Sequence, residues 1–203
     1  MKKKILFATA VVLLVILSTG LCVNATTVTY TVVPGDSLWK IAVKYQVGLS
    51  EIIAANPQFE NPHLIYPGQK VYVPLVNTTT TSYEQQVIDL VNQIRVENGL
   101  KKLNTNWELS RIARYKSQDM HDKNYFSHTS PTYGSPSTMI KNFGLSFKTA
   151  GENIAKGYKT PKAVVDGWMN SSGHRANILN ASYTQTGVGY VGDGNHWTQM
   201  FIG

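Results

Sequence analysis

The sequence predicts an α+β protein built of two folded units, and three observations support this class. Residues 26–76 carry two short β-branched runs around two short apolar helices, which gives the order strand–helix–helix–strand (βααβ). Residues 77–82 form a polar, threonine-rich linker. Residues 83–203 show helical apolar stripes followed by two strand-like runs, a pattern typical of a sandwich in which helices cover a small sheet.

Residues 1–25 have the pattern of a secretory signal peptide. Lysines at positions 2–4 precede an apolar run over residues 5–23, and small residues suitable for cleavage end at Ala25. The apolar run is long for a signal peptide, so an uncleaved membrane anchor is the alternative. A membrane contact is expected only in that case.

Composition fits an exported protein. Cys22 is the only cysteine, so cleavage after Ala25 leaves a chain held by ordinary cores and not by disulfides. We do not expect a lipid on Cys22, because Leu21 stands where lipidation needs a small residue. Cleavage also lowers the formal net charge from +7 to +4. This charge suits anionic wall polymers, although a solvated surface explains it equally well, and the lack of a basic run after Lys4 argues against nucleic acid.

Local signals define the elements of the first unit. The run from Thr29 to Val33 predicts a strand, and Pro34-Gly35-Asp36 predicts a turn. Asp36 or Ser37 can cap the next helix. The apolar face of that helix consists of Leu38, Ile41, Ala42 and Tyr45.

A second helix and a second strand complete this unit. Ser50 is expected to open the helix, and Asn56-Pro57 to end it. Pro67-Gly68 then turns the chain into a last strand, from Lys70 to Val73.

These runs together resemble a LysM domain almost position for position. The matching segments are Tyr30–Ala42, Leu49–Pro57 and Ile65–Pro74. The resemblance implies binding to N-acetylglucosamine polymers, and for a secreted bacterial chain this means peptidoglycan. In the family the glycan lies across two loops at one end of the module. These loops map here to Gly35, Asp36, Ser37 and Leu38, and to Asn61, Leu64 and Ile65. In the alternative interpretation, the first three serve only the turn and the helix cap.

The second unit begins with three predicted helices. The first has an apolar stripe between Val87 and Ile94, with a capping box formed by Ser82 and Gln85 and an end at Asn98-Gly99. The second runs from Leu109 through Met120. The third starts at Thr160-Pro161 and carries Val164, Val165 and Trp168.

Two strands joined by a hairpin end the chain. They are expected over Thr186–Val191 and His196–Ile202, and Gly192-Asp193-Gly194-Asn195 supplies the turn signal.

Four motifs of the second unit resemble a bacterial CAP domain, of the superfamily of cysteine-rich secretory proteins, antigen 5 and pathogenesis-related proteins. The motifs lie at residues 124–131, 151–155, 168–179 and 187–190. Each one alone is weak, but their order makes the set specific. The resemblance covers Tyr83 to Gly203 and implies an α-β-α sandwich with one central cleft.

In that superfamily the cleft often carries two His and two Glu. By motif, the first His corresponds to His128, one Glu to Glu152 and the second His to His196. The second Glu is missing, because Asn170 or Ser171 stands in its place. Two imidazoles and one carboxylate suit zinc with an open fourth position, and they also suit general acid–base chemistry.

Structural roles are the alternative for these residues. His128 can be a polar loop residue, and Glu152 can cap the turn at Gly151. We expect His174 to fix the loop after Trp168, set apart from the cleft.

The combined expectation is a secreted protein associated with a bacterial cell wall or spore coat. LysM binds peptidoglycan, and the CAP domain acts as a binding or effector module without catalysis. The missing second Glu and the lack of a nucleophile with a paired base favour this hypothesis. The alternative is a metal-dependent hydrolase, a peptidase or wall-modifying enzyme, that uses His128, Glu152 and His196.

Overall fold

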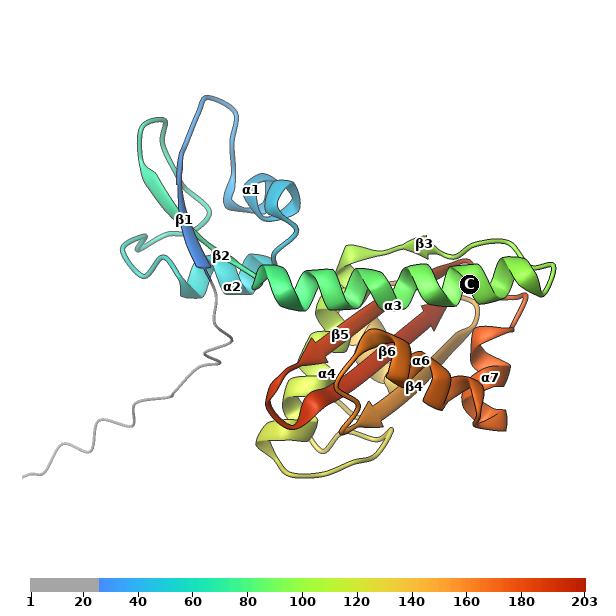
Figure 1. Ribbon diagram of the computed structural model, residues 1–203. Helices are drawn as coiled ribbons and strands as arrows, with labels where there is room; N and C mark the ends of the chain where they lie inside the picture. Colours follow the sequence, from blue (N-terminus) through green and yellow to red (C-terminus); the bar gives the residue numbers. More distant parts are fainter. Residues whose placement is uncertain (1–25) are drawn as a thin grey trace, which may run out of the picture.

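A computed structural model describes residues 26–203 of the chain (Figure 1). The predicted signal peptide, residues 1–25, lies outside the described residues. Within residues 26–203, no helix is both long enough and apolar enough to cross a membrane.

The N-terminal unit has the predicted order strand–helix–helix–strand. Its elements are β1 (Thr26–Thr31), α1 (Leu38–Tyr45), α2 (Leu49–Ala54) and β2 (Lys70–Leu75). The two strands pair antiparallel, with Thr26 opposite Leu75 and Thr31 opposite Lys70. The unit has its own core, which consists of Val32, Leu38, Ile41, Ala42, Val47, Ile52, Val71 and Val73.

The two helices of this unit start differently. The Ser37 side chain caps α1 as expected, by accepting a hydrogen bond of 3.2 Å from the Lys40 N–H. The expectation that Ser50 opens the second helix is wrong. This helix begins at Leu49 with no side-chain cap, and the Ser50 hydroxyl donates instead to the Glu51 carboxylate at 2.6 Å.

The predicted helix of the second unit begins earlier than its apolar stripe indicated. α3 spans Thr78–Glu97, and the Asn77 side chain caps it by accepting from the Thr79 N–H at 2.8 Å. The threonine-rich segment is therefore helical. The capping box of Ser82 with Gln85 does not form, because Ser82 lies inside the helix. The Gln85 amide donates to Asp89 one turn later.

The other elements of the C-terminal unit include the predicted helices and hairpin. They are β3 (Asn104–Thr105), α4 (Trp107–Asp122), α5 (Pro136–Asn142), β4 (Ala150–Lys156), α6 (Pro161–Met169), α7 (Ser172–Ile178), β5 (Gln185–Val191), the short 3₁₀ turn η1 (Asp193–Asn195) and β6 (His196–Ile202). Sequence analysis did not assign α5, α7 or the strands β3 and β4. The sheet order is β3-β5-β6-β4, with β3 parallel to β5 and the other neighbours antiparallel.

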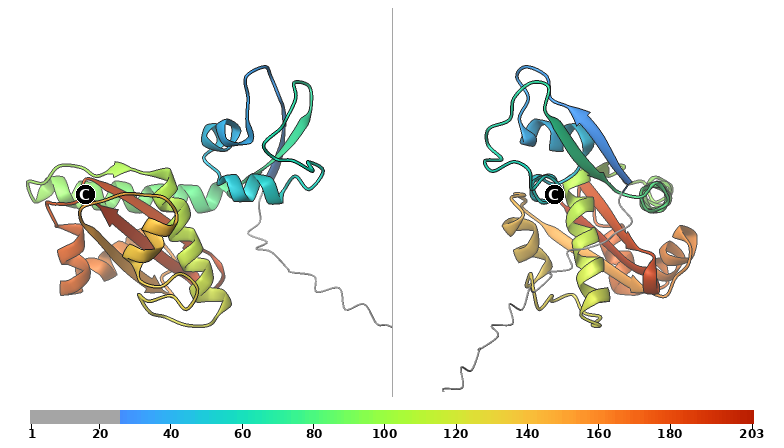
Figure 2. Two further views of the ribbon diagram at one scale, coloured as in Figure 1. Left: turned by 180° about the vertical axis from the view of Figure 1, so that it is seen from behind. Right: turned by 90° about the vertical axis from the view of Figure 1, so that its left-hand side faces the viewer.

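The sheet lies between two helical layers, which confirms the predicted sandwich (Figure 2). One core joins the sheet to α3 and α6 and is centred on Trp168, Val188 and Phe201. The other joins the sheet to α4 and α5 and is centred on Ile112, Met139 and Met200. All seven residues of β6 are buried, as expected for a central strand covered on both faces.

Two glycines of β5 let α4 lie directly on the sheet. A Cβ atom at Gly187 would stand 2.2 Å from the Ser110 nitrogen, and one at Gly189 would stand 2.1 Å from the Arg114 nitrogen. Neither strand position tolerates a larger side chain without displacing the helix.

Candidate functional site

The turn before α1 is organised by Asp36. Its carboxylate accepts hydrogen bonds from the Tyr30 hydroxyl at 2.8 Å and from the Val33 N–H at 2.9 Å. These two bonds hold the pKa of Asp36 below its ordinary value. Gly35 next to it has a φ of +87°, which a residue with a side chain rarely adopts.

The seven residues expected to bind glycan differ in how far their side chains are exposed. Leu38 is only 2% exposed and packs in the core, so it can offer its backbone but not its side chain. Leu64 is 53% exposed. The Asn61 side chain accepts from the His63 N–H at 3.0 Å and stabilises the second loop, and Ile65 packs against the core.

Two exposed aromatic side chains next to these loops were missed by sequence analysis. Trp39 is 60% exposed and Tyr66 is 55% exposed, and each directly follows an expected glycan-binding residue. Exposed aromatic faces next to fixed polar groups suit the binding of a ligand with both apolar and polar faces. Their position beside the loop motifs is the signal that could have identified them.

In the C-terminal unit, the structure brings two of the three expected cleft residues together. The His128 Nδ1 atom lies 2.7 Å from the Glu152 Oε1 atom. Glu152 is buried on β4, whereas the His128 side chain is 53% exposed. Burial raises the pKa of Glu152, and the neighbouring His128 and Lys116 oppose this shift.

Lys116 of α4 binds the backbone of the loop that carries His128. Its side chain is 1% exposed, and its ammonium group donates to the backbone carbonyls of Ser127 and His128 at 2.6 and 3.0 Å. Burial lowers the pKa of Lys116, while the negative charges of Glu152 and Asp119 raise it. This buried lysine was not singled out by sequence analysis, since its partners are brought to it only by the fold.

Asp119, one turn further along α4, holds the other half of the same loop. Its carboxylate accepts from the Tyr125 hydroxyl at 2.6 Å and from the Ser130 hydroxyl at 2.7 Å. The loop that carries His128 is thus fixed to α4 by two buried charged side chains.

His174 lies near the cleft and is not set apart from it as expected. α7 packs on β4, where the Asn177 amide donates to the Glu152 carbonyl at 3.0 Å. Burial, and then the charge of His128, lowers the pKa of His174. The His174 carbonyl accepts from the Asn153 amide at 3.2 Å, next to Glu152 on β4. His174 belongs to the third CAP motif, residues 168–179, and this membership was the sequence feature that could have indicated a place near the cleft.

His196 does not join the pair. In the strand register it lies opposite Lys156, four residues along β4 from Glu152, or about 13 Å away. Its Nδ1 atom instead faces the Asp193 carbonyl at 3.3 Å, and its ring packs edge-on against His121 with centroids 5.6 Å apart.

The expected zinc set is consequently not assembled. Within the described residues 26–203, no group of three or more His, Cys, Asp or Glu side chains is placed to hold a metal ion. His128, Glu152 and His196 do not fit zinc, because His128 contacts Glu152 whereas His196 lies opposite Lys156, four residues further along β4. The arrangement supplies a pair formed by an exposed imidazole and a buried carboxylate. The second carboxylate oxygen, Oε2 of Glu152, has no hydrogen-bond partner among the described residues.

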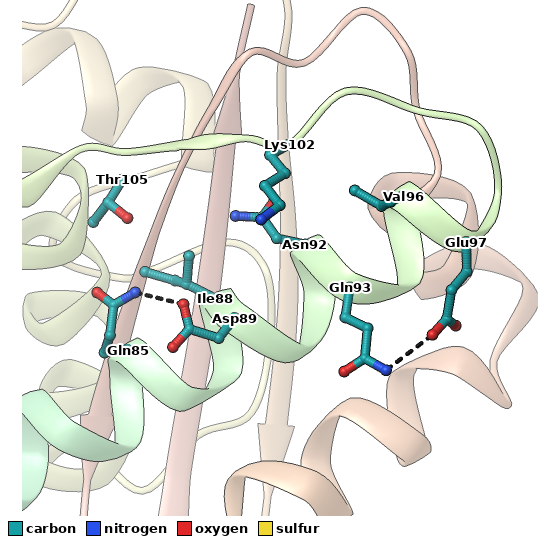
Figure 3. Close-up of a pocket in the computed structure, with 9 residues that line it drawn as sticks. All are labelled: Gln85, Ile88, Asp89, Asn92, Gln93, Val96, Glu97, Lys102 and Thr105. Atoms are coloured by element: carbon teal, nitrogen blue, oxygen red, sulfur yellow. Dashed lines mark hydrogen bonds between the residues drawn. The ribbon is translucent and has the colours of Figure 1, made fainter.

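One hollow in the surface is separate from this pair. It has a volume of about 570 Å³ and lies along α3 (Figure 3). Its polar side chains are already paired along the helix, with Gln85 donating to Asp89 and Gln93 donating to Glu97. We assign it no role, because such pairs are ordinary on a solvated helix.

Comparison with known families identifies both units. A model of the cysteine-rich secretory protein family, CAP, matches residues 88–202. The chain belongs to the CAP family. A LysM family model matches residues 30–74 in front of it. This CAP protein therefore consists of a LysM domain followed by a CAP domain, as the motifs indicated.

Three relatives show which proteins the chain is similar to. YkwD of Bacillus subtilis (strain 168) is 60% identical over 133 residues, which cover 63% of this chain and 52% of YkwD. A crystal structure of an extracellular SCP-domain protein from Bacillus anthracis str. Ames is 38% identical, with a TM-score of 0.59, covering 67% of this chain and 47% of that one. The spore coat assembly protein ExsA of Bacillus cereus is 52% identical over 40 residues, which cover 20% of this chain and 6% of ExsA. The chain spans about half the length of the first two relatives.

Proposed function

We propose that the protein is a secreted component of a bacterial cell wall or spore coat, bound to peptidoglycan through its LysM domain. The observation that carries this is the loop built around Asp36, with exposed Trp39 and Tyr66 beside it. Flat aromatic faces and fixed polar groups are typical of sugar-binding surfaces, because sugars present both C–H faces and hydroxyl groups.

The CAP domain is proposed to be a binding or effector module. Its cleft has an exposed imidazole beside one buried Glu, and Asn170 or Ser171 stands where the family often has a second Glu. The proposed wall location agrees with the extracellular relative from Bacillus anthracis, and the proposed coat location with the LysM-length match to ExsA.

Sedimentation with insoluble peptidoglycan tests the proposed division of labour. Residues 26–76 and residues 77–203 are prepared separately, since each unit has its own core. We expect the LysM fragment to sediment with peptidoglycan and the CAP fragment to remain largely in solution. Equal sedimentation of the two fragments would refute the proposal.

A second candidate function is hydrolysis in the CAP cleft, favoured by one observation. Because Glu152 engages the His128 Nδ1 atom, the Nε2 atom is left as the outward nitrogen of an exposed ring, where it can act as a general base. The experiment incubates the whole protein with peptidoglycan and with a peptide library, with and without zinc. Cleavage products that form with the wild type and disappear in the variant His128→Ala would show that the CAP domain is a hydrolase. Intact substrates under all conditions would favour the binding module instead.

A further inference from the structure

The connection between the two domains is unusually short. β2 ends at Leu75, which packs against the LysM core, and α3 begins at Thr78. Only Val76 and Asn77 lie between them, and Asn77 is engaged as the helix cap. A flexible linker needs many more residues than this to let two domains reorient freely.

The first turns of α3 do not explain a fixed orientation by themselves. Residues 78–81 are four consecutive threonines, and threonine is a poor helix former because its branched side chain loses rotamer freedom. Packing of α3 against the CAP core begins at the partly buried Tyr83, and the first fully buried residue is Glu84. A helix end of this composition is expected to fray, and a frayed end would let the two domains reorient. A fixed orientation therefore needs a second contact between the domains.

Such a contact exists between α2 and α4. The Glu51 Oε1 atom of the LysM domain lies 3.5 Å from the Arg111 Nε atom of the CAP domain. The two side chains are 27% and 20% exposed, so water screens the pair only in part. The other carboxylate oxygen of Glu51 accepts the bond from Ser50, which fixes the direction of the side chain.

The CAP side of this contact is prearranged. The Arg111 guanidinium lies over the rings of Phe143 and Tyr115, at 5.3 and 5.8 Å from their centroids. Burial, and then the charge of Glu51, raises the pKa of Tyr115. Among the described residues, the buried Arg111 Nε atom has no hydrogen-bond partner, and the Glu51 carboxylate contacts it as an ion pair and not as a hydrogen bond. Glu51 supplies the negative charge that this arrangement lacks.

We propose that the contact of Glu51 with Arg111, together with the two-residue connection, holds the LysM and CAP domains in one orientation. The inference rests on the proposed function for its consequence: a LysM domain bound to a glycan strand then presents the CAP cleft in a set direction relative to the wall. The mechanical part of the proposal concerns the free protein and requires no glycan.

Distance measurements between two spin labels test it in the full chain. The background is Cys22→Ser, which removes the only native thiol. Labels are attached through Glu60→Cys in the LysM domain and Lys101→Cys in the CAP domain, both of which are exposed. Glu51→Ala and Arg111→Ala remove the contact from opposite sides. Lys162→Ala is the matched control, since it breaks the exposed ion pair with Asp166 on α6.

We expect one narrow distance distribution in the labelled background and in the Lys162→Ala control. In Glu51→Ala and Arg111→Ala, the distribution should become wider by about a factor of two or more, because several orientations are then populated. Circular dichroism verifies that both variants remain folded. A broad distribution in the background, or a narrow one that survives both substitutions, overturns the proposal. Sedimentation with peptidoglycan is measured on the same samples, so a failure to bind glycan is recognised separately from a failure of the fixed orientation.

Discussion

Asp36 connects the stability of the LysM domain to the shape of the loop that we propose binds glycan. One carboxylate oxygen receives both the Tyr30 hydroxyl and the Val33 N–H, so the loop depends on a charge that two donors stabilise. The same two donors keep the pKa of Asp36 low. A residue with this arrangement affects binding and folding together, and a test must separate the two effects.

We predict that Asp36→Asn weakens sedimentation with peptidoglycan and lowers the melting temperature at pH 7. Because the pKa of Asp36 is lower in the folded state, the carboxylate stabilises the fold above about pH 4, the ordinary pKa of an aspartate. This stabilisation is lost as the pH falls through the lowered pKa. The melting temperatures of the two proteins should therefore converge in acid, which calorimetry across pH measures.

Thr27→Ala is the control for this variant, since Thr27 is exposed on β1 away from the loop. Lys44 is less suitable, because its ammonium group lies 4.6 Å from the centroid of the Tyr30 ring. A difference between wild type and Asp36→Asn that stays constant from pH 7 to pH 2 would contradict the role of the charge.

Lys116 is the second residue whose effect should be large. Lys116→Met keeps the apolar stem but leaves the carbonyls of Ser127 and His128 without their buried donor. Hydrogen bonds from a charged group contribute about 1.5–3 kcal/mol each, so the free energy of unfolding should fall by more than about 2 kcal/mol. Urea denaturation measures the loss, with exposed Lys101→Met as the control. A change below about 0.5 kcal/mol, the range of ordinary surface substitutions, would show that the loop is held by other contacts.

At the scale of the elements, the close approach of α4 to β5 is the most sensitive feature. Gly187 and Gly189 allow the backbone of the helix to lie directly on the strand, where any Cβ atom would collide with main-chain atoms. Main-chain atoms cannot rotate away as a side chain can, so the strain must move the helix. That helix carries both Lys116 and Asp119, which fix the His128 loop.

We predict that Gly189→Ala destabilises the CAP domain by about 1–3 kcal/mol, the cost of overpacking a close contact. Gly173→Ala is the matched control, because a Cβ atom there has no neighbour within 4 Å and Gly173 is helical. Alanine in a helix is more favourable than glycine, so this control should be neutral or slightly stabilising. Thermal unfolding compares the two, and equal melting temperatures would argue against the tight packing of α4.

At the scale of the whole molecule, the domain order agrees with the proposed location. A LysM domain precedes the CAP domain, and an apolar segment with the features of a signal peptide precedes both. Export and removal of that segment would leave a chain without cysteine.

We predict that the protein recovered from the culture fluid or from the wall has a mass corresponding to a chain that begins at Thr26. It should not react with a thiol reagent, because Cys22 is removed with the signal peptide. Mass spectrometry and thiol labelling measure both properties. A full-length mass in the membrane fraction would instead identify residues 5–23 as an anchor.

The sequence by itself determined the two domains and most of their elements. Turn residues such as Pro34-Gly35 and caps such as Ser37 and Thr160 act through neighbours in the chain, so their effects can be predicted locally. The helical stripes and the terminal hairpin follow in the same way. The start of α3 was missed because four threonines disfavour a helix locally. The nearby contact of Glu51 with Arg111 joins residues far apart in the sequence, so it gives no local signal.

Only the tertiary structure decided which side chains meet. Glu152 reaches His128 across 24 positions of sequence, whereas His196, which motif comparison placed beside them, lies near His121 at the other end of β4. The physical reason is strand register: each residue advances the chain by about 3.3 Å, so a side chain four positions away on a rigid strand cannot reach the same cleft. Motifs report which residue types are present, but the register of β4 against β6 sets the distances on which binding chemistry depends.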